Sequence, residues 1–184
     1  MSHQATQELQ NWIDTLPEHE KTCASDIHEY ISSRGIKPRK IKRGYVLFEY
    51  WFKGNRVLIL RENSYRGTPL DIAIPYGLKG NYDDIDSFIT ACSNETDSEN
   101  LIKYVINNAC YCDSCGGNGG CENWKEFAEV RRKMAVCHYD ITKWKAPKEK
   151  LNYTDEDLFW LKRLVDVKMK QALQTVRQRD TTSE

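Results

Sequence analysis

The chain has 184 residues, of which 40% are apolar and 11% aromatic, and its 27 basic side chains balance 27 acidic ones. This composition is typical of a folded globular domain, and it excludes disordered, collagen-like and repeat architectures. The zero net charge argues against a dedicated nucleic-acid-binding protein, and no apolar run approaches the ~20 residues that span a membrane. We therefore expect a single domain over residues 1–184 with no membrane partner, and the overall charge does not favour a nucleic-acid partner.

Two helices are predicted in the N-terminal part, residues 5–35. The first is indicated by apolar side chains at helical spacing and ends at Pro17; its stripe is Leu9, Trp12, Ile13 and Leu16. The second is expected to begin near Ser25 or Asp26, where Glu29 follows Asp26 at the spacing of a capping box.

Residues 44–76 are predicted to form the sheet. Residues 45–52 and 56–60 are rich in β-formers and are separated by a Lys-Gly-Asn turn, and within residues 69–75 the larger apolar side chains recur at every second position. We expect an antiparallel meander with one face covered. The aromatic side chains crowded into residues 45–52 exceed what one core face needs, so they indicate either a ligand pocket or plain core: Tyr45, Phe48, Tyr50, Trp51 and Phe52. Of these, Tyr45, Tyr50 and Trp51 are the candidate ligand-binding residues.

The second half of the chain mixes helices and strands. Apolar stripes predict two helices within residues 83–109, residues 124–132 suit one or two helical turns, and residues 133–144 alternate as a strand would. Thr154 and Asp157 then have the spacing of a capping box, so the last helix is expected to run from about residue 155 to 178.

That last helix is longer than a compact domain of this size needs. Its second half keeps an apolar line along one side, formed by Met169, Ala172, Leu173 and Val176, while basic residues occupy the remainder. An exposed apolar line usually marks an interface, which predicts a homodimer through this helix. The alternative is a frayed polar tail from about residue 174.

The cysteines form the clearest motif. The loop over residues 110–123 contains a Cys-x2-Cys-Gly turn and four glycines in five positions, and five cysteines lie in or near it: Cys110, Cys112, Cys115, Cys121 and Cys137. A Cys-x2-Cys turn supplies two ligands of a tetrahedral zinc site. We therefore predict one structural zinc, bound by the second and third cysteines together with two of the others. Free thiols, a redox pair or an iron–sulfur cluster are the alternatives.

Three further observations concern the cysteines. His138 lies beside Cys137, so one of the two is expected to point away from the site if this segment is a strand. Cys23 and Cys92 lie on apolar helical positions and are expected to be small buried hydrophobes. An odd number of cysteines and a polar start unlike a secretory signal predict a reducing cytoplasm rather than a secreted disulfide framework.

The order of elements resembles a family of small uncharacterised bacterial proteins with a cysteine-cluster loop. The resemblance covers residues 40–172 and is carried by the helix start at 154–157 and by four cysteines: Cys112, Cys115, Cys121 and Cys137. It implies an α+β fold with a helix-flanked antiparallel sheet, and the grouping of these cysteines. From the residues themselves we expect three to four strands in that sheet. It implies no particular activity.

These patterns favour a cytoplasmic, zinc-stabilised α+β binding module for a protein or a small apolar ligand. The sequence contains no phosphate loop, no nucleophile elbow and no zincin motif. An enzyme that uses a thiol pair or an open metal site at the cysteine cluster is one alternative. The other is a nucleic-acid-binding accessory protein that uses residues 34–43, which carry six basic side chains.

Overall fold

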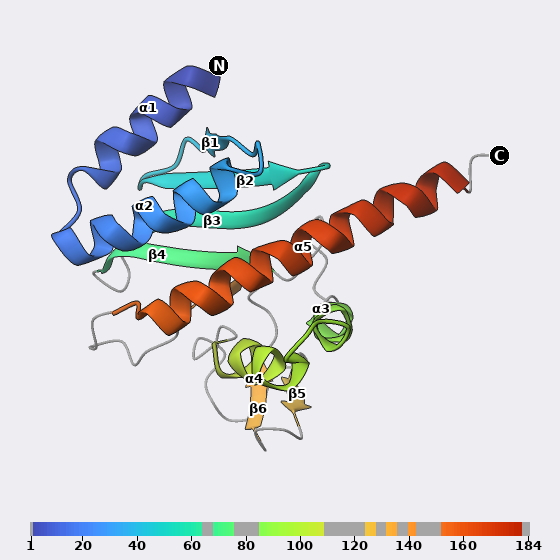
Figure 1. Ribbon diagram of the computed structural model, residues 1–184. Coiled ribbons are helices and arrows are strands. Elements are labelled where there is room, and N and C mark those ends of the chain that lie inside the picture. The colour runs from blue at the N-terminus through green and yellow to red at the C-terminus, as the bar shows by residue number, and fades with distance from the viewer. Residues whose placement is uncertain are drawn as a thin grey trace.

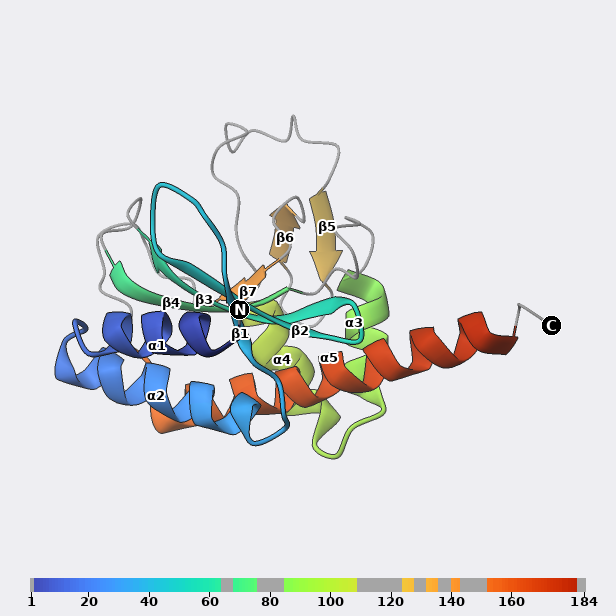
Figure 2. The ribbon, with the colours of Figure 1, turned by 90° about the horizontal axis from the view of Figure 1, so that it is seen from above.

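The computed structural model describes residues 2–63, 68–75, 85–108, 124–127, 132–135, 140–142 and 152–181. Its architecture is α+β: the helices lie on one side of an antiparallel sheet, and the C-terminal helix extends past the sheet (Figures 1 and 2). In the described part of the chain, each helix is too short or too polar to cross a membrane.

The N-terminal helices are α1 (Ser2–Ile13) and α2 (Glu18–Ser32). The predicted start of α2 near Ser25 or Asp26 is wrong by about two turns, because the helix begins directly after Pro17. Proline suits that boundary, and acidic side chains in the first turn favour the positive end of the helix dipole. The buried stripe of α2 also begins before the expected start, since it consists of Cys23, Ala24, Ile27 and Ile31.

The sheet has the strand order β1-β2-β3-β4-β7. Its centre is the predicted meander, formed by β2 (Leu47–Phe52), β3 (Asn55–Asn63) and β4 (Thr68–Pro75). The edge strands β1 (Pro38–Lys40) and β7 (Asp140–Thr142) raise the number of strands above the predicted three to four. β1 lies inside the basic segment 34–43, for which the sequence predicted no strand. Pro38 is tolerated there because an edge strand leaves some N–H groups outside the ladder.

The turn between β2 and β3 shows why these strands pair as predicted. Lys53 and Gly54 both have positive φ angles, 49° and 77°. Two consecutive left-handed residues make a type I′ turn, whose twist matches that of the flanking strands.

The second half begins with α3 (Ile85–Ser93) and α4 (Ser98–Asn108), as predicted. The predicted strand over residues 133–144 is divided between two sheets. β6 (Arg132–Ala135) pairs with β5 (Trp124–Phe127), whereas β7 pairs with β4. β5 also replaces the helical turns expected at residue 124. Alternation in sequence indicates extended chain, but it does not show which sheet a short strand joins.

The main core lies between the helices and the sheet face that carries Phe48, Tyr50, Leu58, Leu60, Ile72 and Ile74, all of which are fully buried. The prediction that only one face is covered is incomplete. Leu47, Ile59 and Ala73 form a second buried cluster on the opposite face, beside the ion pair between Arg61 and Asp71.

The helix α5 (Asp155–Thr181) begins as predicted, with a capping box. The Asp157 carboxylate accepts hydrogen bonds from the N–H and the hydroxyl of Thr154, and the Thr154 Oγ1 accepts the Asp157 N–H at 3.2 Å. Just before it, the Tyr153 hydroxyl accepts the buried N–H of Ile72 at 2.8 Å, and the Tyr153 carbonyl lies 2.8 Å from His19 Nε2. These bonds fix the start of α5 against both β4 and α2.

The second half of α5 is partly covered. Gln171 donates a hydrogen bond to the Ser87 carbonyl on α3, Lys168 lies over the Phe88 ring, and Ala172 is fully buried. Leu173 is 38% exposed. The predicted apolar line is therefore divided: Met169 and Ala172 are turned into the protein, whereas Leu173 faces outward.

Candidate ligand-binding groove

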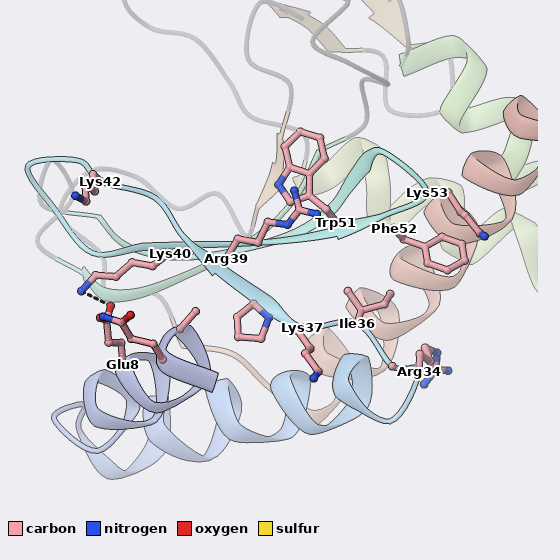
Figure 3. A pocket seen from close by; sticks show the side chains of 14 residues that line it. Glu8, Arg34, Ile36, Lys37, Arg39, Lys40, Lys42, Trp51, Phe52 and Lys53 are labelled. Atoms are coloured by element: carbon pink, nitrogen blue, oxygen red, sulfur yellow. Dashed lines mark hydrogen bonds and ion pairs between the residues drawn. The ribbon is translucent and has the colours of Figure 1, made fainter. Parts of the chain in front are cut away.

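A cavity of about 830 Å³ follows the edge strand β1. Its walls come from the start of α1, the connection from α2 to β1, and the end of β2 with its turn (Figure 3). We call this cavity the β1 groove. Its apolar lining is Ala5, Ile36, Pro38, Trp51 and Phe52. The elements are brought together by local folding, because β1 pairs with β2 and α1 packs beside β1.

The charged lining of the β1 groove has one dominant sign. Among the described residues that line it, the one acidic residue is Glu8, whereas six are basic: Arg34, Lys37, Arg39, Lys40, Lys42 and Lys53. Five of the six come from the basic segment 34–43, which the sequence singled out. The sixth, Lys53, belongs to the β2–β3 turn and is brought to the same cavity by the hairpin.

Two of the six cations are neutralised within the protein. Lys40 Nζ lies 2.8 Å from a carboxylate oxygen of Glu8, and this hydrogen bond lowers the pKa of Glu8. Arg34 Nε lies 3.0 Å from Asp166 on α5. Within the described part of the chain, Lys37, Lys42 and Lys53 are exposed and form no ion pair with an acid. The groove therefore carries positive charges that are not neutralised by acidic side chains of the described residues.

The Trp51 side chain is held in a defined orientation. The strand register shifts between Tyr50 and Trp51, so Trp51 pairs with Arg56. Its indole N–H donates to Glu49 at 2.9 Å, and Arg56 donates to the other oxygen of the same carboxylate at 2.7 Å. The Arg39 guanidinium lies 5.7 Å from the centre of the indole ring, and Figure 3 shows the two side chains together. A bulge that redirects a side chain in this way is common beside binding sites.

The three aromatic side chains predicted to bind a ligand are not brought together. Trp51 lines the groove, but Tyr50 is fully buried in the core, where its hydroxyl lies 2.8 Å from His28 Nδ1. Burial raises the pKa of Tyr50. Tyr45 is 39% exposed and does not line the groove.

Sequence reasoning missed the remaining walls of the groove. Gln4, Ala5 and Glu8 come from α1, and their approach to β1 is a tertiary contact without a local signal. Phe52 was among the aromatic side chains that the sequence suggested for a pocket, and Lys53 had a signal because the hairpin turn was predicted, but the position of β1 beside them was not predicted.

The predicted zinc ligands lie outside the described residues, as does His138: Cys110, Cys112, Cys115, Cys121 and Cys137. Where the structure describes the chain, it contains no group of three or more His, Cys, Asp or Glu side chains arranged to hold a metal ion. The zinc site therefore stays a prediction from sequence spacing.

The isolated cysteines are buried, as predicted. Cys23 and Cys92 are free thiols with 2% and 0% exposure. Cys23 Sγ lies 3.8 Å from His19 Nε2, a pairing that can activate a nucleophile. However, burial and the surrounding carboxylates raise the pKa of Cys23 to about 11, and burial raises that of Cys92 to about 12. Both groups are therefore neutral thiols at pH 7, and neither is an activated nucleophile.

Comparison with known proteins gives no match: no family model fits the sequence, and neither a curated protein nor a solved structure is significantly similar to the chain. The α+β fold and the geometry of the β1 groove are thus the basis for a functional assignment.

Proposed function

We propose that the protein is a binding module whose ligand is an anion with an apolar part, held in the β1 groove. The observation that carries this proposal is a set of three lysines that form no ion pair within the described residues and that line one concave site together with apolar side chains. Ligand sites usually combine an apolar lining with a few polar groups that orient the ligand. The basic lining favours an anionic ligand over the wholly apolar ligand that the sequence suggested.

Calorimetric titration with inorganic tripolyphosphate tests the proposal. We expect binding that weakens as the salt concentration rises, because exposed charges are screened. The double variant Lys37→Glu, Lys42→Glu should lose about tenfold or more in affinity. The matched control Lys103→Glu reverses a charge on the exposed surface of α4, outside the groove, and should bind as the unmodified protein does. Equal affinities for both variants would contradict the assignment of the groove.

We also propose that the cysteine loop holds one structural zinc, and the spacing of Cys112 and Cys115 supports this. Because zinc binding in such loops is coupled to folding, Cys112→Ser and Cys115→Ser should lower both the metal content and the melting temperature of the purified protein. Unchanged metal content in both variants would end the zinc hypothesis. The odd cysteine count, with free thiols at Cys23 and Cys92, supports a cytoplasmic location.

The homodimer is a further proposal, and the exposed side of α5 near Leu173 supports it. Light scattering on the full chain should give the mass of a dimer, and Leu173→Glu should give that of a monomer. Phe159→Glu is the matched control, because it changes an exposed apolar residue elsewhere on α5 and should leave the dimer mass unchanged. Lys170→Glu would not serve, because Lys170 is paired with Glu95. A monomer mass for the unmodified chain at micromolar concentration would refute the dimer.

A further inference from the structure

We infer that the ligand of the β1 groove is single-stranded nucleic acid, with a base stacked at Trp51 and phosphates bound by Lys37, Lys42 and Lys53. This inference rests on the proposed function and names the class of anion. It is drawn from an oriented aromatic ring that lines the same hollow as three lysines without an ion pair in the described part of the chain, with Lys42 and Lys53 toward opposite ends of that hollow (Figure 3).

Trp51 has the properties of a stacking platform. Its only polar atom is already satisfied by Glu49, so a bound base need not compete for it. Glu49 is in turn held by Arg56, so the ring is oriented before any ligand arrives. The guanidinium of Arg39 beside the ring adds a second planar group, and bases stack on both aromatic rings and guanidinium planes. Each stacked base contributes to affinity without a requirement for a particular sequence.

The spacing of the cations favours a strand over a single nucleotide. Lys42 follows β1 near the start of β2, where Ile41 N–H bonds to Leu47, while Lys53 follows the last residue of β2. The six residues of β2 extend over roughly 20 Å. One nucleotide that stacks on Trp51 cannot reach both lysines, whereas consecutive phosphates of a strand can. Unpaired lysines at such positions act as point charges for the backbone.

The same geometry disfavours the other polyanions. In a duplex the bases are stacked on one another and offer no free face to a ring inside a cavity, so this site suits unstacked bases. An acidic peptide would satisfy the lysines but would leave the Trp51–Arg39 pair without a flat partner. The zero net charge of the whole chain does not oppose this inference, because acidic residues lie elsewhere, as in the first turns of α2 and α5.

Fluorescence anisotropy with the full chain and a labelled twelve-residue oligothymidine tests the inference. We expect this strand to bind at least tenfold more tightly than an abasic strand of the same length. Trp51→Leu should weaken binding of the oligothymidine by about 5- to 150-fold, the range for one lost stacked base. Trp51→Phe also removes the indole N–H but keeps an aromatic face, so it should retain most of the affinity. Phe159→Leu, which changes an exposed aromatic residue outside the groove, should have no effect.

The alternative outcomes separate the two levels of the assignment. Base stacking would be overturned if the abasic strand bound as tightly as the oligothymidine and if Trp51→Leu did not weaken oligothymidine binding. In that case, binding of tripolyphosphate would still support an anion site. If thymidine monophosphate bound as tightly as the oligothymidine, the claim that the ligand is a strand would be overturned. Equally tight binding of a polyglutamate peptide would overturn the claim that the ligand is a nucleic acid. Failure of both tripolyphosphate and oligothymidine to bind would overturn the proposed function together with this inference. Far-UV circular dichroism establishes that each variant is folded.

Discussion

The charges between α5 and its neighbours and the charges along the β1 groove are used differently. On the helical side, α5 is joined to its neighbours by paired charges: Arg34 with Asp166, Lys162 with Asp26, and Lys170 with Glu95. The Tyr30 hydroxyl donates to the same Asp166 carboxylate at 2.6 Å, and the Arg34 guanidinium lies 3.6 Å from the Tyr30 ring centre. Along the β1 groove, three lysines stand without such partners in the described chain.

This difference separates groups that hold the fold from groups that are free to bind. Removal of a partner on the helical side leaves a buried or half-buried polar group unsatisfied, so the effect falls on stability. Removal of an exposed lysine in the groove disturbs no internal contact, so its effect should fall on ligand binding. The following changes test that separation.

The largest effect is expected at Tyr153, on the helical side. Tyr153→Phe removes the acceptor of the buried Ile72 N–H and should lower the free energy of unfolding by about 1–3 kcal/mol. Urea denaturation measures this loss. Tyr45→Phe removes a hydroxyl from an exposed residue and should change stability little. Binding of tripolyphosphate to the Tyr153 variant at a temperature where it is folded should be unchanged, and a matching loss of binding would contradict the separation.

A smaller loss is expected at the start of α5. Thr154→Ala removes the hydroxyl that accepts the Asp157 N–H, and loss of such a cap costs about 1 kcal/mol. Thr22→Ala is the matched control, because the Thr22 hydroxyl bonds only to the Glu18 carbonyl in the same helix. If both variants unfold at the same urea concentration, the capping box does not stabilise α5.

The helical side should also give the protein a pH-dependent stability through His28. Burial lowers the pKa of this imidazole below its usual 6.5, so the unfolded chain binds a proton more readily than the folded one. Stability is therefore full above pH 6.5 and declines as the pH falls from 6.5 through the folded pKa. Unfolding curves at several pH values measure the slope, and His28→Gln should flatten it whatever its overall stability. An unaltered slope in that variant would assign the dependence to other groups.

The smallest change in stability is expected in the groove. Lys37→Gln alters an exposed side chain that forms no ion pair with any described residue, so the free energy of unfolding should change by no more than about 0.5 kcal/mol. The same substitution should weaken tripolyphosphate binding measurably. A variant that is destabilised yet binds normally would place Lys37 among the structural groups instead.

Features with local causes were predictable from the sequence. The β2–β3 hairpin depends on a turn beside two runs of β-formers, and the start of α5 depends on Thr154 and Asp157. The early start of α2 also had a local signal, since Cys23 and Ala24 begin its buried stripe, but a capping pattern at Asp26 competed with it.

Features that depend on tertiary pairing were not predictable. Three residues of a basic segment become β1 because β2 offers them an edge, and residues 133–144 divide because β4 and β5 each accept a different part. The groove follows the same rule. The cations of segment 34–43 were evident from the sequence. That they line one cavity with Trp51, Lys53 and α1 could not be predicted, because this depends on where β1 lies in the sheet.

At Lys53, stability of the hairpin and binding in the groove favour different residues. Lysine has no intrinsic preference for a φ of 49°, whereas asparagine followed by glycine is the favoured pair for this turn. Lys53→Asn should therefore relieve local backbone strain and make the hairpin form more readily. It would also remove one of the three unpaired cations of the groove, so the variant that folds best is not the one that binds best.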